Sequence, residues 1–257
     1  MFRAVNKLWQ QCFAPDGKKS NAAASHIVST VKLGSDYGGW HIPADLRLSS
    51  TDVCLLAGAG EDVSFDCALA MRYPCIIHIF DPTPRAIAHF TALSAAVAAA
   101  KPFAPLSAGG GPPYQINAEV FSRMSFHPFG LVAQDTEMRF YAPRNPEYVS
   151  HSILNLKKTT EFFTAPVKRV ESILKELAIS RIALMKIDIE GAEYQVIEDM
   201  IATRTLPRIL CVEFDEIHNP LDSAAQNRIE QYIKMLEHAG MRHIVTDVAN
   251  MTFIQQG

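Results

Sequence analysis

The sequence predicts an α/β domain whose mostly parallel sheet carries helices on both faces. From about residue 50 onward, short apolar runs typical of buried strands alternate with segments of helical periodicity. Several of these runs end in glycine or aspartate, as buried parallel strands do where they enter a crossover loop. The last two runs, 242–248 and 251–255, are only two residues apart, which predicts a hairpin and an antiparallel last strand.

The first half of this alternation predicts two strands, each followed by a helix. Residues 53–58 and 75–80 are apolar runs of strand length. Asp62 can cap a helix that runs to about residue 71, and Pro84 suits the first turn of a helix over 84–100. Residues 101–113 hold too many glycines and prolines for regular structure and predict a loop.

The second half predicts strands near 125–132 and 138–143, followed by an excursion from the core over 144–165. Regular periodicity then resumes. It predicts a helix over 170–177, a strand over 182–188, a helix around 196–201, a strand over 208–214 and a helix over 229–236 that Gly240 closes.

Composition narrows the functional classes. With 48% hydrophobic and 20% charged residues, the 257-residue chain can bury a full core. A net charge of -3, without any long run of lysine and arginine, predicts no nucleic-acid partner. No segment has the length of a membrane span or a signal peptide, so we expect no membrane partner and a cytoplasmic location. The five cysteines lack CxxC spacing, so we expect them to be buried free thiols. The sequence does not indicate an oligomeric state.

A glycine turn follows the first predicted strand, in the segment LLAGAGEDVSFD. Gly58 and Gly60 would let a ligand approach the backbone closely. Val63 replaces the third glycine of the dinucleotide fingerprint, and Glu61 and Asp62 would repel a pyrophosphate. S-adenosylmethionine fits better, because it carries a sulfonium and an ammonium and no phosphate. A plain tight turn with a capping acid is the alternative.

Further acids stand at predicted strand ends. Asp81 lies 21 residues after Gly60, close to the spacing of about 20 at which a carboxylate binds ribose hydroxyls. In the segment LMKIDIEGAEYQ, Asp188 ends another buried strand, and Glu190 and Glu193 flank the next turn. Helix capping accounts for one of these three acids, so the others are candidates for chemistry.

The string KIDIEGAE is very similar to the signature of the FkbM family of methyltransferases. Other family landmarks follow in the family's order: YGGW, GAGEDVSFD, FDPTP, HPFGL, VSHSI and VEF. The resemblance covers roughly residues 36–255 and implies a Rossmann-like class I methyltransferase fold with a seven-stranded, mostly parallel sheet. It implies a methyltransferase domain over 51–257 and an N-terminal extension or lid over 1–50.

The same resemblance implies S-adenosyl-L-methionine as the cofactor. Gly58 and Gly60 would hold its methionine part, Glu61 or Asp62 its ammonium, and Asp81 its ribose. The other implied contacts are the lid residues Tyr37, Gly38, Gly39 and Trp40, the ribose wall Pro82 and Thr83, and the adenine neighbours Gly130 and Leu131.

The implied reaction is methyl transfer to a hydroxyl of a small molecule or glycan. Such a hydroxyl needs a positioned base or a metal ion to lose its proton. The candidate bases, in order of preference, are Asp188, Glu190 and His151, followed by His127 and His218. Asp188, Glu190 and Glu213 could alternatively gather a divalent cation, although we expect no metal. The competing functions are a nicotinamide-dependent oxidoreductase and a non-catalytic, methyltransferase-like binding protein.

Overall fold

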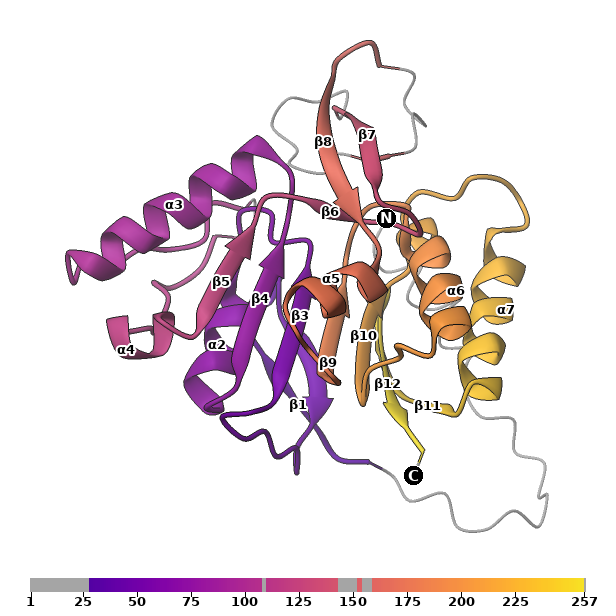
Figure 1. Ribbon diagram of the computed structural model, residues 1–257, viewed down its shortest axis with the longest axis horizontal. Helices are drawn as coiled ribbons and strands as arrows, with labels where there is room; N and C mark the ends of the chain where they lie inside the picture. The colour runs from indigo at the N-terminus through magenta and orange to yellow at the C-terminus, as the bar shows by residue number, and fades with distance from the viewer. Residues whose placement is uncertain (1–27, 108–109, 143–151, 154–158, 257) are drawn as a thin grey trace.

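The computed structural model describes residues 28–107, 110–142, 152–153 and 159–256. Figure 1 shows an open sheet with helices on both sides. The spatial order of its seven strands is β11-β12-β10-β9-β3-β4-β5. These strands are β3 (Val53–Ala57), β4 (Ile76–Phe80), β5 (Met124–His127), β9 (Ile182–Ile187), β10 (Ile209–Glu213), β11 (Met241–Asp247) and β12 (Asn250–Gln255). The predicted Rossmann-like, seven-stranded sheet is confirmed.

The predicted closing hairpin is also present. β12 pairs antiparallel with both β10 and β11, whereas β10, β9, β3, β4 and β5 pair in parallel with one another in that order. The hairpin turn passes through Val248 with a φ of 59°. The parallel strands therefore end together at one edge of the sheet, where crossover loops create a crevice.

Helices cover the two faces of the sheet because its central strands are apolar on both sides. Leu184 of β9 belongs to one buried cluster, while its neighbour Met185 belongs to another. The first face carries α2 (Ser64–Arg72), α3 (Pro84–Ala98) and α4 (Ala118–Phe121). The second carries α5 (Val170–Glu176), α6 (Glu193–Thr203), η1 (Asp215–Ile217) and α7 (Ala225–His238). No helix in the described ranges is long and apolar enough to cross a membrane.

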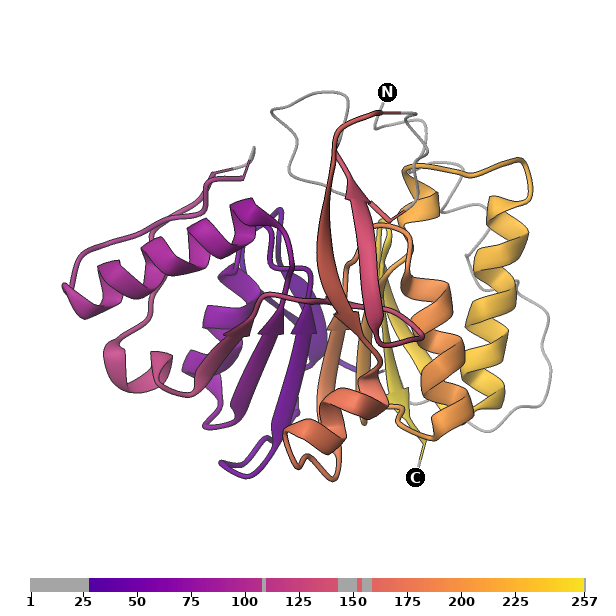
Figure 2. The same ribbon diagram turned by 45° about the horizontal axis from the view of Figure 1, so that its top comes forward.

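The strand predicted over 125–132 was wrong in one respect: the structure divides it. β5 joins the main sheet, whereas β6 (Gly130–Leu131) belongs to a second sheet with β7 (Thr136–Tyr141) and β8 (Phe162–Lys168). Pro128 lies between the two strands and has no N–H to continue a ladder. Figure 1 shows the β7–β8 pair beyond the carboxyl edge of the main sheet, and in Figure 2, where that edge is turned forward, the pair lies in front of the strand ends.

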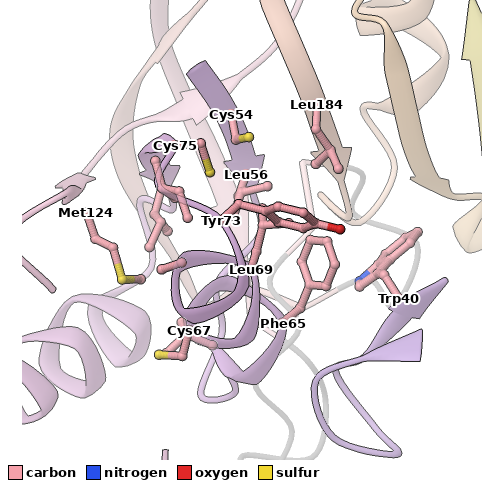
Figure 3. Packing of buried hydrophobic residues seen from close by; sticks show 14 of the residues in the cluster. Trp40, Cys54, Leu56, Phe65, Cys67, Leu69, Tyr73, Cys75, Met124 and Leu184 are labelled. Atoms are coloured by element: carbon pink, nitrogen blue, oxygen red, sulfur yellow. The ribbon is translucent and has the colours of Figure 1, made fainter. Parts of the chain in front are cut away.

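An N-terminal hairpin packs against the first face. β1 (Thr30–Leu33) pairs antiparallel with β2 (Trp40–Pro43). Trp40 is only 2% exposed and lies beside Phe65 of α2 in Figure 3. The four described cysteines are buried free thiols, as expected: Cys54, Cys67, Cys75 and Cys211. Cys12 lies outside the described residues.

Arg123 closes the C-terminal end of α2 from a distance in the sequence. Its guanidinium donates to the carbonyl oxygens of Ala70, Tyr73 and Cys75 over 2.7–3.2 Å. Lysine cannot reproduce this planar fork. We expect Arg123→Lys to lower the free energy of unfolding by about 1–2 kcal/mol, measured by urea titration. Arg72→Lys, at an exposed arginine of the same helix, is the control; equal effects of both changes would contradict this role for Arg123.

Candidate functional site

A cavity of about 650 Å³ opens where the loops after β3, β4, β9 and β10 meet. Parallel α/β sheets bind ligands at this edge. The cavity brings together all thirteen predicted cofactor contacts with Asp188 and Glu190: Tyr37, Gly38, Gly39, Trp40, Gly58, Gly60, Glu61, Asp62, Asp81, Pro82, Thr83, Gly130 and Leu131 line it. Residues that lie 150 positions apart in the sequence therefore share one hollow.

Gly58 is required by the protein's own packing. Its φ is +85°, and a Cβ at this position would lie 1.7 Å from the carbonyl oxygen of Asp188. The end of β3 therefore contacts the end of β9 through bare backbone. Gly60 differs, because its φ is +50° but a Cβ there would meet open space. Close approach of a ligand explains Gly60 better than it explains Gly58.

Asp81 connects the glycine turn to the start of α3. Its Oδ2 accepts hydrogen bonds from the backbone N–H groups of Ala59 and Gly60, both at 2.9 Å. Its Oδ1 accepts from the N–H and the hydroxyl of Thr83, at 2.8 and 2.6 Å. Four donors occupy the lone pairs of this buried carboxylate. Asp81 thus fixes the conformation of the glycine turn.

The two acids after the turn have different partners. Glu61 forms an ion pair with Arg85, at 2.6 Å between Oε2 and Nη2. Asp62 accepts from the hydroxyl of Ser35 at 2.6 Å and from the N–H of Ser64 at 2.9 Å. The prediction that Asp62 caps this helix was wrong, because the N-cap residue of α2 is Val63 and no side chain caps it. Asp62 lies one residue earlier, and its bonds to Ser35 and Ser64 hold the β1–β2 loop against the start of α2. Gly38 lies so close that a Cβ there would be 2.8 Å from the carboxyl carbon of Asp62.

Asp188 and Glu213 form a carboxyl pair at the cavity. Ile187 of β9 pairs with Val212 of β10 in parallel register, which places the next residue of β9 beside the last residue of β10. The two carboxyl groups are therefore neighbours at the ends of adjacent strands, and each affects the ionisation of the other. Burial, followed by the charge of Asp188, raises the pKa of Glu213 well above its ordinary value. Burial also raises the pKa of Asp188.

The turn after β9 assigns different tasks to its two glutamates. Glu193 accepts from the N–H groups of Ile189 and Gly191 at 3.0–3.2 Å, so it is the acid that the turn itself uses. Burial raises the pKa of Glu193 to about 7. Glu190 lines the cavity and has a φ of 55°, an unfavourable conformation for a residue with a Cβ. Its carbonyl accepts from the hydroxyl of Ser152.

Of the two candidate histidines that the structure describes, only one lies at the cavity. His218 lines the cavity, and its Nε2 lies 3.5 Å from Oε1 of Glu213. His127 is instead on the face of β5, where it contacts Nδ1 of His78 at 3.0 Å and stacks on Phe80. Burial lowers the pKa of His127. His151 lies outside the described residues.

Sequence reasoning missed Lys186, which lines the cavity and is 3% exposed. Its ammonium donates to the carbonyl oxygen of Gly58, directly beneath the turn. Leu184, Lys186 and Asp188 alternate along the strand, which puts the lysine and the aspartate on one side of the sheet. A lysine inside an otherwise apolar strand was the available signal. Asp215, also missed, lines the same cavity.

Asp66 is buried beneath this site and makes stability depend on pH. Neither of its carboxylate oxygens has a hydrogen-bond partner among the described residues. Burial raises its pKa from 3.8 to about 6, although the charge of Lys186 opposes that shift. The folded protein then binds more protons than the unfolded chain between these pH values. Stability contributed by neutral Asp66 is therefore complete below pH 3.8 and lost as the pH rises through 6.

We expect Asp66→Asn to remove this loss, which amounts to about 3 kcal/mol at most. The measurement is urea unfolding of both proteins at a series of pH values on either side of the window. The advantage of the variant should grow with pH up to about 6 and then stay constant. A difference between the two proteins that does not change with pH would contradict the assignment.

The side chains around the cavity suit a cationic nucleoside. Nine acidic residues and two lysines line it. The apolar lining residues Phe80, Leu131 and Phe140 offer a surface for a flat base. Gly130 leaves room for the ring of Phe140, because a Cβ at position 130 would lie 3.0 Å from that ring. Within the described ranges, no three His, Cys, Asp or Glu side chains are grouped as ligands of a metal ion.

Comparison with known proteins adds a family match. The sequence matches the methyltransferase FkbM domain over residues 58–242. Structural matches include an rRNA methylase from Streptococcus thermophilus, at 7% identity and a TM-score of 0.41 over 82% of this chain and 90% of that one. Fibrillarin from Methanococcus jannaschii, a pre-rRNA processing protein, matches at 10% identity and a TM-score of 0.41 over 95% and 92% of the two chains. A search of curated proteins finds no significant match.

Proposed function

Since the chain belongs to the FkbM methyltransferase family, we propose that it uses S-adenosyl-L-methionine to methylate a hydroxyl group of a small molecule or glycan. The cavity at the carboxyl edge of the sheet carries this proposal. There the glycine turn, Asp81 and the Asp188–Glu213 pair line a single hollow, so that a cofactor site and candidate proton acceptors adjoin.

The proposed cofactor site uses the turn, its acids and the apolar wall. The open backbone at Gly60 and the carboxylates of Glu61 and Asp62 would face the methionine part. Asp81 would accept from the ribose hydroxyls after exchanging some of its present donors, and Leu131 would lie against the adenine. When bound, this cofactor supplies an electrophilic methyl group on a positively charged sulfur.

The residues of this chain would orient the acceptor hydroxyl and receive its proton. Methyl transfer is an in-line displacement, so alignment of the hydroxyl oxygen with the methyl group is the main requirement. Asp188 is the proposed proton acceptor, because it lies at a strand end whose backbone contacts the glycine turn at Gly58. Glu190 flanks the same hollow and would orient the acceptor. His151, the other proposed base, lies outside the described residues.

Electrostatics supports a small acceptor over a nucleic acid. The nine acidic residues of the cavity would repel a phosphate backbone. The same acidic residues would repel the pyrophosphate of a nicotinamide dinucleotide. In addition, Val63 occupies the position of the third glycine in the dinucleotide-binding fingerprint. These features favour the proposed function over an oxidoreductase.

Isothermal titration with S-adenosylhomocysteine and with NAD tests the proposal on the complete chain. We expect saturable binding of the first and none of the second. Methyl-labelled S-adenosylmethionine, incubated with a panel of hydroxylated small molecules and oligosaccharides, should then transfer its label to a hydroxyl oxygen. Binding of NAD would contradict the proposal. Binding without transfer to any acceptor would favour a non-catalytic binding protein.

A further inference from the structure

We propose that the free protein holds one proton between Asp188 and Glu213 and releases it when the positively charged methyl donor binds. Asp188, the proposed proton acceptor, would then be freed from the proton that it shares with Glu213 only when the donor is in place. This inference rests on the proposed function and adds to it a regulation of the same site.

The sheet register forces the two carboxyl groups together. Parallel neighbours in a sheet are about 4.8 Å apart, and Asp188 and Glu213 follow the paired residues Ile187 and Val212. Both side chains lie on the side of the sheet that carries Lys186. Both residues are only partly exposed, and two carboxylates at this separation repel each other when both are charged.

The surroundings retain the proton on Glu213. Lys186 supplies positive charge from within the sheet and favours the ionised form of Asp188. Burial, followed by the charges of Asp188 and Glu190, raises the pKa of Glu213, so the shared proton stays on Glu213. The titratable and charged groups around the pair are Lys186, Glu190, Asp215, His218, Tyr37, Asp81 and, from α2, Asp66.

The glycine turn couples cofactor binding to this proton. The carbonyl oxygen of Asp188 lies where a Cβ of Gly58 would stand, so the pair adjoins the proposed cofactor position. A positive charge bound there favours the form with two carboxylates, because opposite charges lower carboxyl pKa values. S-adenosylmethionine brings this sulfonium charge, whereas the thioether of S-adenosylhomocysteine is neutral. The two ligands differ only in the methyl group on sulfur and in the positive charge that comes with it, so their comparison reports mainly on that charge.

His218 offers the released proton a route to solvent. Its Nε2 is 3.5 Å from Oε1 of Glu213, and its side chain is 44% exposed. In the reaction that follows, the hydroxyl oxygen forms a bond to the methyl carbon while the carbon–sulfur bond breaks. The electron pair of that bond stays on sulfur, and the hydroxyl proton passes to Asp188.

Isothermal titration in buffers with different ionisation enthalpies measures the proton released by each ligand without an acceptor. At pH 7 we expect S-adenosylmethionine to release about one proton more than S-adenosylhomocysteine. Glu213→Gln should abolish this difference, because an amide has no proton to release in this range. Asp188→Asn should do the same and serves as the second variant if the first fails to fold. Glu216 is a buried acid three residues after Glu213 that does not line the cavity, so Glu216→Gln should leave the difference in proton release unchanged.

The possible results distinguish a failure of the proton switch from a failure of the proposed function on which it rests. Binding of both nucleosides with equal proton release overturns the proton switch and leaves the cofactor assignment intact. A difference that persists in both variants of the pair also overturns it, because the proton then comes from another group. If neither nucleoside binds the wild-type chain, the proposed function fails and the switch fails with it.

Discussion

Asp81→Ala is expected to weaken the binding of S-adenosylhomocysteine by about 1–3 kcal/mol, which is roughly 5- to 150-fold in the dissociation constant. The carboxylate accepts four hydrogen bonds from Ala59, Gly60 and Thr83. Its removal takes away the proposed ribose acceptor and also releases the turn that the methionine part would contact. Binding should therefore suffer for two reasons that act in the same direction.

Calorimetric titration of the wild type, Asp81→Ala and Thr83→Ala separates these two reasons. Thr83→Ala removes only the hydroxyl that donates to Asp81 and should cost much less affinity. Urea unfolding shows how much of the effect comes from the released turn, because N–H groups that lose their acceptor inside the protein lower the free energy of unfolding. An affinity of Asp81→Ala equal to that of the wild type would remove the ribose assignment.

The main sheet could be predicted because its strands are apolar runs that end in turn residues. β3, β4, β9 and β10 lie within a residue or two of their predicted bounds. β8 was missed, because alternating exposure and Pro166 hide it within a polar stretch. Proline has no N–H to donate to a neighbouring strand. Pro166 is tolerated because β6 pairs with β8 only at Val167 and Lys168, so the pairing with β6 does not require an N–H at position 166.

The residues of the site could be predicted better than their tasks. Gly58 is recognisable from the sequence, but its packing against Asp188 depends on β9 lying beside β3. Asp188 was recognisable as well, whereas its partnership with Glu213 depends on the strand order and not on any spacing along the chain. Motifs thus identify side chains, and the sheet topology decides which of them share a proton.

Gly58→Ala is expected to lower the free energy of unfolding by at least about 3 kcal/mol and to abolish binding of S-adenosylhomocysteine. The added Cβ would lie 1.7 Å from the carbonyl oxygen of Asp188, and the φ of +85° disfavours any residue other than glycine. Backbone must move to relieve this overlap. The movement displaces either the glycine turn or the end of β9, and both line the proposed cofactor site.

Gly60→Ala is the matched control for this prediction. Its φ of +50° also disfavours alanine, but the new Cβ would meet open space. Its cost in stability should be only about 1–2 kcal/mol, the penalty for the left-handed conformation. Urea unfolding ranks the two variants, and titration with S-adenosylhomocysteine shows whether the open space beside Gly60 belongs to the ligand. Equal stability of the two variants would mean that the contact between the ends of β3 and β9 is looser than the structure shows. In that case the coupling between the turn and the Asp188–Glu213 pair would lose its structural basis.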